Sequence, residues 1–215
     1  MFLVADEVML AYFIHALVSI FAVLNPLGIM PSFLAMTAGR THEEQRVIAR
    51  KAVLASFFIL LVFLLLGNVI LNLFSITIDA FRVAGGILLF GIAYDLLHAK
   101  PSPIQSPDGE KVVQQDITLT PLAMPIIAGP GTITTVMALS AGPDRVISVV
   151  DVFLAFTVVL VVTYGIFYNA PQINRRLSQT QLNVITRLMG FLLSIIAIQM
   201  AANGIGGLFP LLLHH

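Results

Sequence analysis

The chain has 215 residues, of which 58% are apolar and 10% charged, and its mean hydropathy is +0.98. Because a soluble domain carries about 25% charged residues, this composition excludes a soluble enzyme, a nucleic-acid-binding protein and a disordered protein. The 11 basic and 11 acidic side chains cancel, and the absence of cysteine excludes disulfides and thiolate chemistry. The apolar residues fall in blocks long enough to cross a bilayer, which predicts an integral membrane protein.

Six apolar segments have the length of a membrane span, which is about 20 residues for about 30 Å of hydrocarbon. The first segment is too long for one straight span and contains Pro26, Gly28 and Pro31, so we expect it to be kinked, broken or partly interfacial. The sequence therefore predicts an all-α membrane protein with spans at 8–36, 52–74, 80–98, 118–141, 149–169 and 183–202.

Basic residues between the spans predict how the chain is oriented. On one side they occur in all three connections: Arg40, Arg46, Arg50, Lys51, Lys100, Lys111, Arg175 and Arg176. On the other side Arg145 is in a loop and Arg82 stands at the start of the third span. Since positive charge stays in the cytoplasm, both termini are expected outside it.

Two sequence features recur in the same order in the two halves of the chain. The first span contains Asn-Pro-Leu-Gly at 25–28, and the fourth contains Gly-Pro-Gly-Thr at 129–132. Each is followed, 56 and 57 residues after its proline, by an Arg-x-x-Gly at 82–85 and 187–190. Three spans in each half place the second half upside down relative to the first. We predict one membrane domain made of inverted repeats at 1–98 and 118–215, joined by a cytoplasmic linker at 99–117.

The proline and glycine breaks predict where a ligand binds. Past each break a half-helix begins with unpaired N–H groups and about half a positive charge, which suits an anion. The preceding half-helix offers carbonyl groups, which suit an ammonium group, so a small zwitterion fits both. The alternative is that the breaks are kinks that improve helix packing. The predicted substrate-binding residues are Asn25, Pro26, Leu27, Gly28, Ala128, Gly129, Pro130, Gly131 and Thr132, with further hydroxyls from Thr134 and Thr135.

Few charged side chains lie inside the spans. Arg82 and Arg187 are either gating or anchoring residues bonded to the other half's helix ends, or side chains that extend to the interface. Asp95 is the candidate for proton or ion coupling, with an interfacial position as the alternative. His15 is a second candidate proton group, with a histidine bonded to its own helix as the alternative. No catalytic constellation, metal site or cofactor motif emerges, so we do not expect an enzyme.

Four stretches spread over the chain carry a family resemblance. They are NPLGIMP at 25–31, FRVAGGIL at 81–88, PLAMPIIAGPGT at 121–132 and ITRLMGFL at 185–192. With them the sequence resembles the MarC family (UPF0056) of bacterial and archaeal inner-membrane proteins, some of which are small neutral amino acid transporters. The resemblance implies six helices in two inverted halves, with helices 1 and 4 discontinuous and the substrate between them.

The first functional hypothesis is a secondary transporter of glycine, alanine and serine that works by alternating access. Its partners would be the lipid bilayer, a small neutral amino acid and a coupling proton or sodium ion, and a homo-oligomer stays open. Asn25-Pro26 at the start of a half-helix suggests an aquaporin-like channel for small neutral solutes as an alternative. In the second half, however, Gly129 stands at the position of this asparagine. A non-transporting membrane scaffold is the third alternative, and it leaves the paired breaks unexplained.

Overall fold

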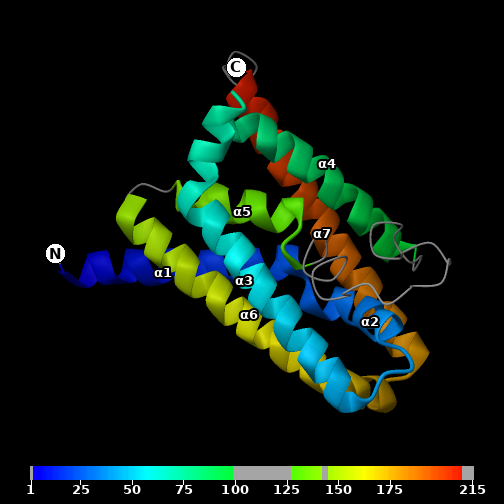
Figure 1. The fold of residues 1–215 in the computed structure, drawn as a ribbon. Helices are drawn as coiled ribbons and strands as arrows, with labels where there is room; N and C mark the ends of the chain where they lie inside the picture. The colour runs from blue at the N-terminus through cyan, green and yellow to red at the C-terminus, as the bar shows by residue number, and fades with distance from the viewer. Residues whose placement is uncertain (1, 99–126, 142–144, 210–215) are drawn as a thin grey trace.

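The computed structural model describes residues 2–98, 127–141 and 145–209. In these ranges the chain is helical and contains no strand. Five of the segments described are long and apolar enough to cross a membrane, in agreement with the expected all-α membrane protein. The helices are α1 (Phe2–Leu24), α2 (Pro26–Met36), α3 (His42–Leu73), α4 (Ile78–Leu97), α5 (Pro130–Ser140), α6 (Arg145–Arg176) and α7 (Gln179–Leu208) (Figure 1).

The described residues include only part of the predicted fourth span and none of the linker before it. The linker at 99–117 and the start of the span at 118–126 lie outside the described residues. The described part of the span contains α5, whose 11 residues measure about 16 Å at about 1.5 Å per residue. That length covers roughly half of the hydrocarbon layer.

Three helices extend beyond the apolar spans that the sequence predicts. α3 begins at His42 rather than near 52, α6 continues to Arg176, and α7 begins at Gln179. α3 and α7 each begin with a capping box. In the box of α3, the Thr41 hydroxyl accepts the Glu44 N–H and the Glu44 carboxylate accepts the Thr41 N–H at 2.8 Å. Polar helical turns therefore extend these helices past their apolar segments, where a count of apolar residues does not detect them.

The chain turns sharply between α1 and α2 at Asn25. This residue has φ 50° and ψ 59°, a left-handed conformation that asparagine tolerates better than most residues. Its Oδ1 accepts the Gly28 N–H at 3.1 Å, and Pro26 is the first residue of α2. A Cβ at Gly28 would lie 2.3 Å from Asn25 Nδ2, so only glycine fits beneath this cap.

Helices α4 and α7 lie side by side in Figure 1 and pack closely. A Cβ on Gly86 of α4 would lie 2.7 Å from the Ala197 carbonyl oxygen of α7. Conversely, a Cβ on Gly190 of α7 would lie 3.0 Å from the Ala93 carbonyl oxygen of α4. Glycines on both helices thus let the two backbones approach each other, as small residues do in membrane helix pairs.

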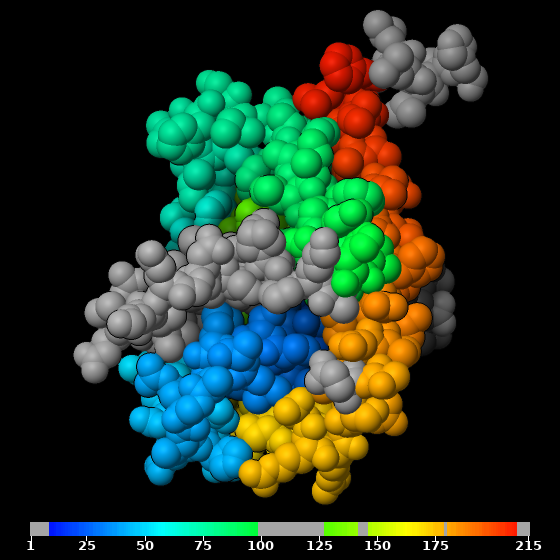
Figure 2. Space-filling model, turned by 90° about the vertical axis from the view of Figure 1, so that its right-hand side faces the viewer, coloured from blue at the N-terminus to red at the C-terminus, as the bar shows by residue number. Residues whose placement is uncertain are grey.

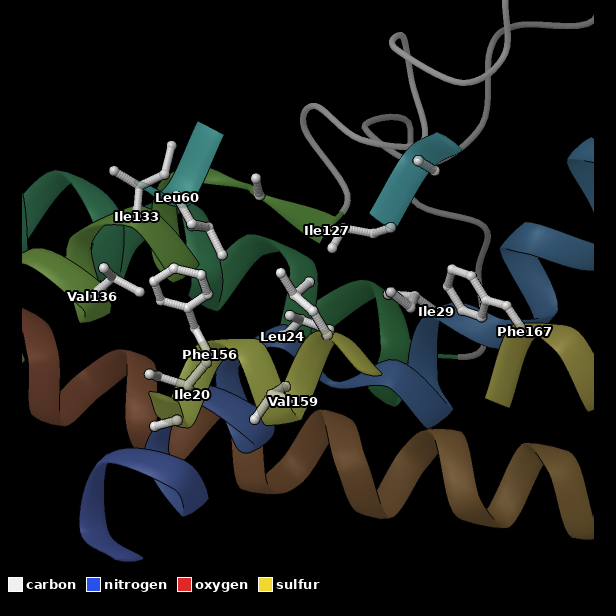
Figure 3. Packing of buried hydrophobic residues seen from close by; sticks show 14 of the residues in the cluster. Ile20, Leu24, Ile29, Leu60, Ile127, Ile133, Val136, Phe156, Val159 and Phe167 are labelled. Atoms are coloured by element: carbon white, nitrogen blue, oxygen red, sulfur yellow. The ribbon is translucent and has the colours of Figure 1, made fainter. Parts of the chain in front are cut away.

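The main apolar core lies between α1, α2, α3, α5 and α6. Phe33 of α2 stacks on Phe167 of α6 with ring centroids 4.5 Å apart, and both side chains are fully buried. Figure 3 shows Ile20 of α1 beside Phe156 of α6 within the same cluster. This core fixes the position of α2 against α6, and therefore the position of the turn at Asn25.

The outward faces of the long helices are apolar as well. Exposed large apolar side chains recur along α3, α6 and α7, among them Leu54, Phe58, Leu65, Val69, Val158, Val161, Val162, Leu188, Phe191, Ile195 and Ile198. A soluble monomer rarely exposes apolar surface on this scale. These faces are consistent with contact to lipid.

Candidate site between two helix breaks

A small internal cavity lies where the turn at Asn25 meets the beginning of α5. Its volume is about 30 Å³, comparable to the share of one water molecule in the liquid. Residues from α1, α2, α4, α5 and α7 meet around it. They are Val23, Leu24, Asn25, Ile29, Leu88, Leu89, Ile92, Leu96, Gly129, Pro130, Gly131, Thr132 and Leu193.

The N-terminus of α5 carries backbone donors without a partner. Gly129 precedes the helix in an extended conformation, with φ −74° and ψ 169°, and no side chain caps the helix end. Pro130 has no N–H, and the Ile133 N–H donates to the Gly129 carbonyl at 3.0 Å. Within the part of the chain that the structure describes, the N–H groups of Gly131 and Thr132 form no hydrogen bond.

Asn25 contributes a third donor to the same cavity. The residue is 3% exposed, and its Oδ1 is engaged by the Gly28 N–H. Its Nδ2 is buried and has no hydrogen-bond partner among the residues that the structure describes. An unsatisfied buried donor costs about 1–3 kcal/mol, and such groups in folded proteins call for an explanation, which a bound ligand would supply.

The electrostatics of the cavity suit an anion, although none of the described residues that line it is charged. The amides of Gly131 and Thr132 and the α5 dipole all favour negative charge. The remaining walls are apolar and come mainly from α4. Sequence reasoning missed Leu88, Leu89, Ile92, Leu96 and Leu193, because apolar residues within apolar spans carry no signal of their own.

The predicted substrate-binding residues divide into two groups. Asn25, Gly129, Pro130, Gly131 and Thr132 line the cavity. Pro26, Leu27, Gly28 and Ala128 are next to these residues in the chain but do not line it.

The hydroxyls of the next turn of α5 are not free to contact a ligand. The Thr134 hydroxyl donates to the Pro130 carbonyl at 2.6 Å, and the Thr135 hydroxyl donates to the Gly131 carbonyl at 2.8 Å. Both bonds close back on the helix itself. Of the three threonines suggested by the sequence, Thr132 is the one that lines the cavity.

The predicted charged residues lie away from the cavity. Arg82 forms an ion pair with Asp79, one turn earlier on α4, at 2.8 Å. Arg187 is exposed on α7 and has no ion pair among the described residues. Asp95 is half-buried near the end of α4, and His15 is exposed on α1. Their gating and coupling roles remain predictions.

Asp151 on α6 is a polar residue that sequence reasoning passed over. It is 7% exposed, and its buried Oδ2 has no partner within the described ranges. The signal was present, because this acid lies inside the predicted span at 149–169, and intramembrane acids are rare and functional by default.

Comparison with known proteins identifies the family. A model of the MarC family, described as integral membrane proteins, matches residues 10–209. The chain belongs to the MarC family. It is 47% identical over 208 residues to UPF0056 membrane protein YvbG of Bacillus subtilis, and the aligned region covers 95% of this chain and 99% of the relative. No solved structure matches it.

Other MarC relatives come from both prokaryotic domains. UPF0056 membrane protein MJ1677 of Methanocaldococcus jannaschii is 39% identical over 200 residues, covering 92% of this chain and 98% of the relative. UPF0056 membrane protein YhcE of Escherichia coli is 38% identical over 200 residues, covering 92% and 93%. The expected family is therefore confirmed, and the chain is a multi-pass integral membrane protein with relatives in bacteria and archaea.

Proposed function

We propose that this protein is a secondary transporter of small neutral amino acids such as glycine, alanine and serine. The observation that carries the proposal is that three donors without a partner among the described residues belong to residues that line one cavity. These are the backbone N–H groups of Gly131 and Thr132 and the Asn25 Nδ2. A carboxylate accepts hydrogen bonds from all three, at about 1.5–3 kcal/mol for each bond to a charged group.

The remaining lining supports a small and neutral substrate. Among the described residues that line the cavity there is no lysine, arginine, aspartate or glutamate, so a charged side chain on the substrate would find no counter-charge from them. Leu89 packs so closely on α5 that a Cβ at Gly131 would lie 2.4 Å from its side chain. A bulky substrate side chain would have to displace this leucine.

The helix contacts support six helices in two inverted repeats, with the first and fourth discontinuous. α2 contacts α6 and α7, and α5 contacts α3 and α4, so each half-helix packs on the second and third helices of the other half; α5 also contacts α6 of its own half. The equivalent helices also meet, α3 with α6 and α4 with α7. A two-fold axis in the membrane plane predicts this exchange of contacts.

The size of the cavity supports alternating access. A cavity of about 30 Å³ holds water rather than an amino acid. Loading therefore requires the helices around it to separate, first on one side of the membrane and then on the other. In this proposal α4 and α7, which supply the apolar wall, move relative to the two helix breaks.

Ion coupling in this proposal rests on intramembrane acids. Asp95 was the candidate from sequence, and Asp151 is the more deeply buried of the two. A buried carboxylate without a partner is stabilised by binding a proton or a sodium ion. Transport by Asp95→Asn and Asp151→Asn variants, each with and without a proton or sodium gradient, assigns the coupling residue.

Competition binding on the purified protein tests the proposal. Glycine, alanine and serine should compete with labelled glycine within about tenfold of one another, since they differ by small groups. Glycinamide and ethylamine lack the carboxylate and should compete at least about a hundredfold more weakly. Equal competition by glycine and glycinamide would refute the carboxylate site, and absence of binding by either would refute the transporter.

A further inference from the structure

A second pocket lies at the C-terminal end of α6. Its volume is about 270 Å³, near the lower end of the roughly 300–1,000 Å³ typical of small-ligand pockets. Two helices build it, α3 with its first turns and α6 with its last turns, and Figures 1 and 2 show these segments together at one end of the molecule. The lining residues are His42, Arg46, Tyr168, Pro171, Gln172 and Arg175.

The pocket concentrates positive charge. Arg46 and Arg175 come from the two helices, and none of the described residues that line the pocket is acidic. Neither arginine forms an ion pair within the described residues. Glu44 is nearby in sequence, but its carboxylate accepts hydrogen bonds from the Thr41 N–H and hydroxyl at 2.8 and 2.9 Å.

The geometry holds one guanidinium group in place. The Arg46 Cζ lies 4.0 Å from the centroid of the Tyr168 ring, a cation–π contact that orients the planar group. A fixed guanidinium can bind two oxygens of one phosphate at once. Since Tyr168 and Arg175 are two turns apart on α6, they lie on the same face of that helix and both reach the pocket.

We propose that this pocket binds the phosphate headgroup of an anionic phospholipid. Arg46 precedes the apolar part of α3 and Arg175 follows that of α6, positions that suit a headgroup at the membrane surface. Exposed apolar side chains lie farther along both helices, Leu54 and Phe58 on α3 and Val161 and Val162 on α6. Acyl chains can lie along these side chains, whereas a free phosphate ion makes no use of them.

Thermal unfolding of the full-length protein in detergent tests the assignment without measuring transport. The probes are phosphatidylglycerol, phosphatidylcholine with the same acyl chains, and inorganic phosphate. Phosphatidylglycerol should raise the Tm saturably, and phosphatidylcholine should not. Arg46→Gln and Arg175→Gln should each weaken the phosphatidylglycerol response about fivefold, which corresponds to the roughly 1 kcal/mol typical of one basic residue at a charged membrane surface.

Arg176→Gln is the matched control, because Arg176 is the next residue on α6, is equally exposed and does not line the pocket. Its response to phosphatidylglycerol should match that of the unmodified protein. A loss in Arg176→Gln as large as in Arg175→Gln would overturn the proposal, since it would indicate general charge attraction. An arginine-dependent response to inorganic phosphate without one to phosphatidylglycerol would overturn the assignment to a lipid.

Discussion

The helices that follow the two breaks, α2 and α5, both have a proline at the first helical position, but their N-termini are capped differently. At α2 the side chain of Asn25 caps the Gly28 N–H at 3.1 Å. At α5 the preceding residue is Gly129, which has no side chain, and the helix end is uncapped. α2 therefore has one of its donors capped by the Asn25 side chain, whereas the Gly131 and Thr132 amides of α5 have no partner among the described residues. In the proposed function this difference gives the two breaks different roles, the first shaping the site and the second binding the substrate carboxylate.

Gly131→Val should have the largest effect on binding. A side chain at 131 would occupy the approach to the α5 amides, where a Cβ already comes within 2.4 Å of the Leu89 side chain. We expect glycine binding and transport to be lost. Gly91→Ala is the control, because a Cβ at Gly91 meets nothing within 4 Å, and it should bind normally and gain up to about 1 kcal/mol of stability. Normal transport by Gly131→Val would show that α5 does not hold the substrate.

Asn25→Asp should separate the two roles of this side chain. Aspartate tolerates the left-handed conformation and keeps an acceptor for the Gly28 N–H, but it replaces the Nδ2 donor with an oxygen. Glycine affinity should fall about tenfold to a hundredfold, because a charge-assisted bond worth about 1.5–3 kcal/mol is lost. Competition binding measures it, with Asn25→Gly as the variant that lacks both groups. Unchanged affinity in Asn25→Asp would limit the residue to capping.

Leu89→Ala should change which substrates fit. Leu89 is 4% exposed and packs against Gly131, so its truncation enlarges the cavity beside the α5 amides. Valine should compete about tenfold better relative to glycine, as expected when a pocket gains room for a few methyl groups. The Tm should fall, since such truncations cost about 2–5 kcal/mol. An unaltered ratio of valine to glycine would place the substrate side chain elsewhere.

Thr134→Val should have the smallest effect. The hydroxyl of Thr134 donates to the Pro130 carbonyl rather than into the cavity, and valine has nearly the same shape. Glycine affinity should stay within about threefold of the unmodified protein, which is less than the effect of one neutral hydrogen bond at its upper range of about 1.5 kcal/mol. A loss as large as that of Asn25→Asp would mean that the threonine hydroxyls bind substrate after all.

Part of the candidate site could be predicted from the positions of proline and glycine in the sequence. Their effects on the backbone are local, so Asn25 and Gly129 marked two points that both line one cavity. The wall formed by Leu89 and Leu193 was not readable, because it depends on packing between helices distant in sequence. The basic pocket was hidden for a different reason. Its arginines contributed to the predicted orientation, and nothing in the sequence paired Arg46 with Arg175.

The helix boundaries show the same limit. Apolar length predicts where a helix can lie in the membrane, and it predicted five segments that the structure describes as long helices. It does not predict the polar turns that precede 52 in α3, which depend on the capping box at Thr41 and on the packing of α3 against α6. Those turns carry His42 and Arg46, which line the second pocket.

Amide NMR of the protein labelled with ¹⁵N-glycine and ¹⁵N-threonine tests most directly whether the substrate binds at the α5 amides rather than at the capped N-terminus of α2. The N–H resonances of Gly131 and Thr132 should shift saturably on addition of glycine and much less on addition of glycinamide. The Gly28 N–H, which is already bonded to Asn25 Oδ1, should shift little with either ligand. A large shift at Gly28 with Gly131 and Thr132 unchanged would contradict the account.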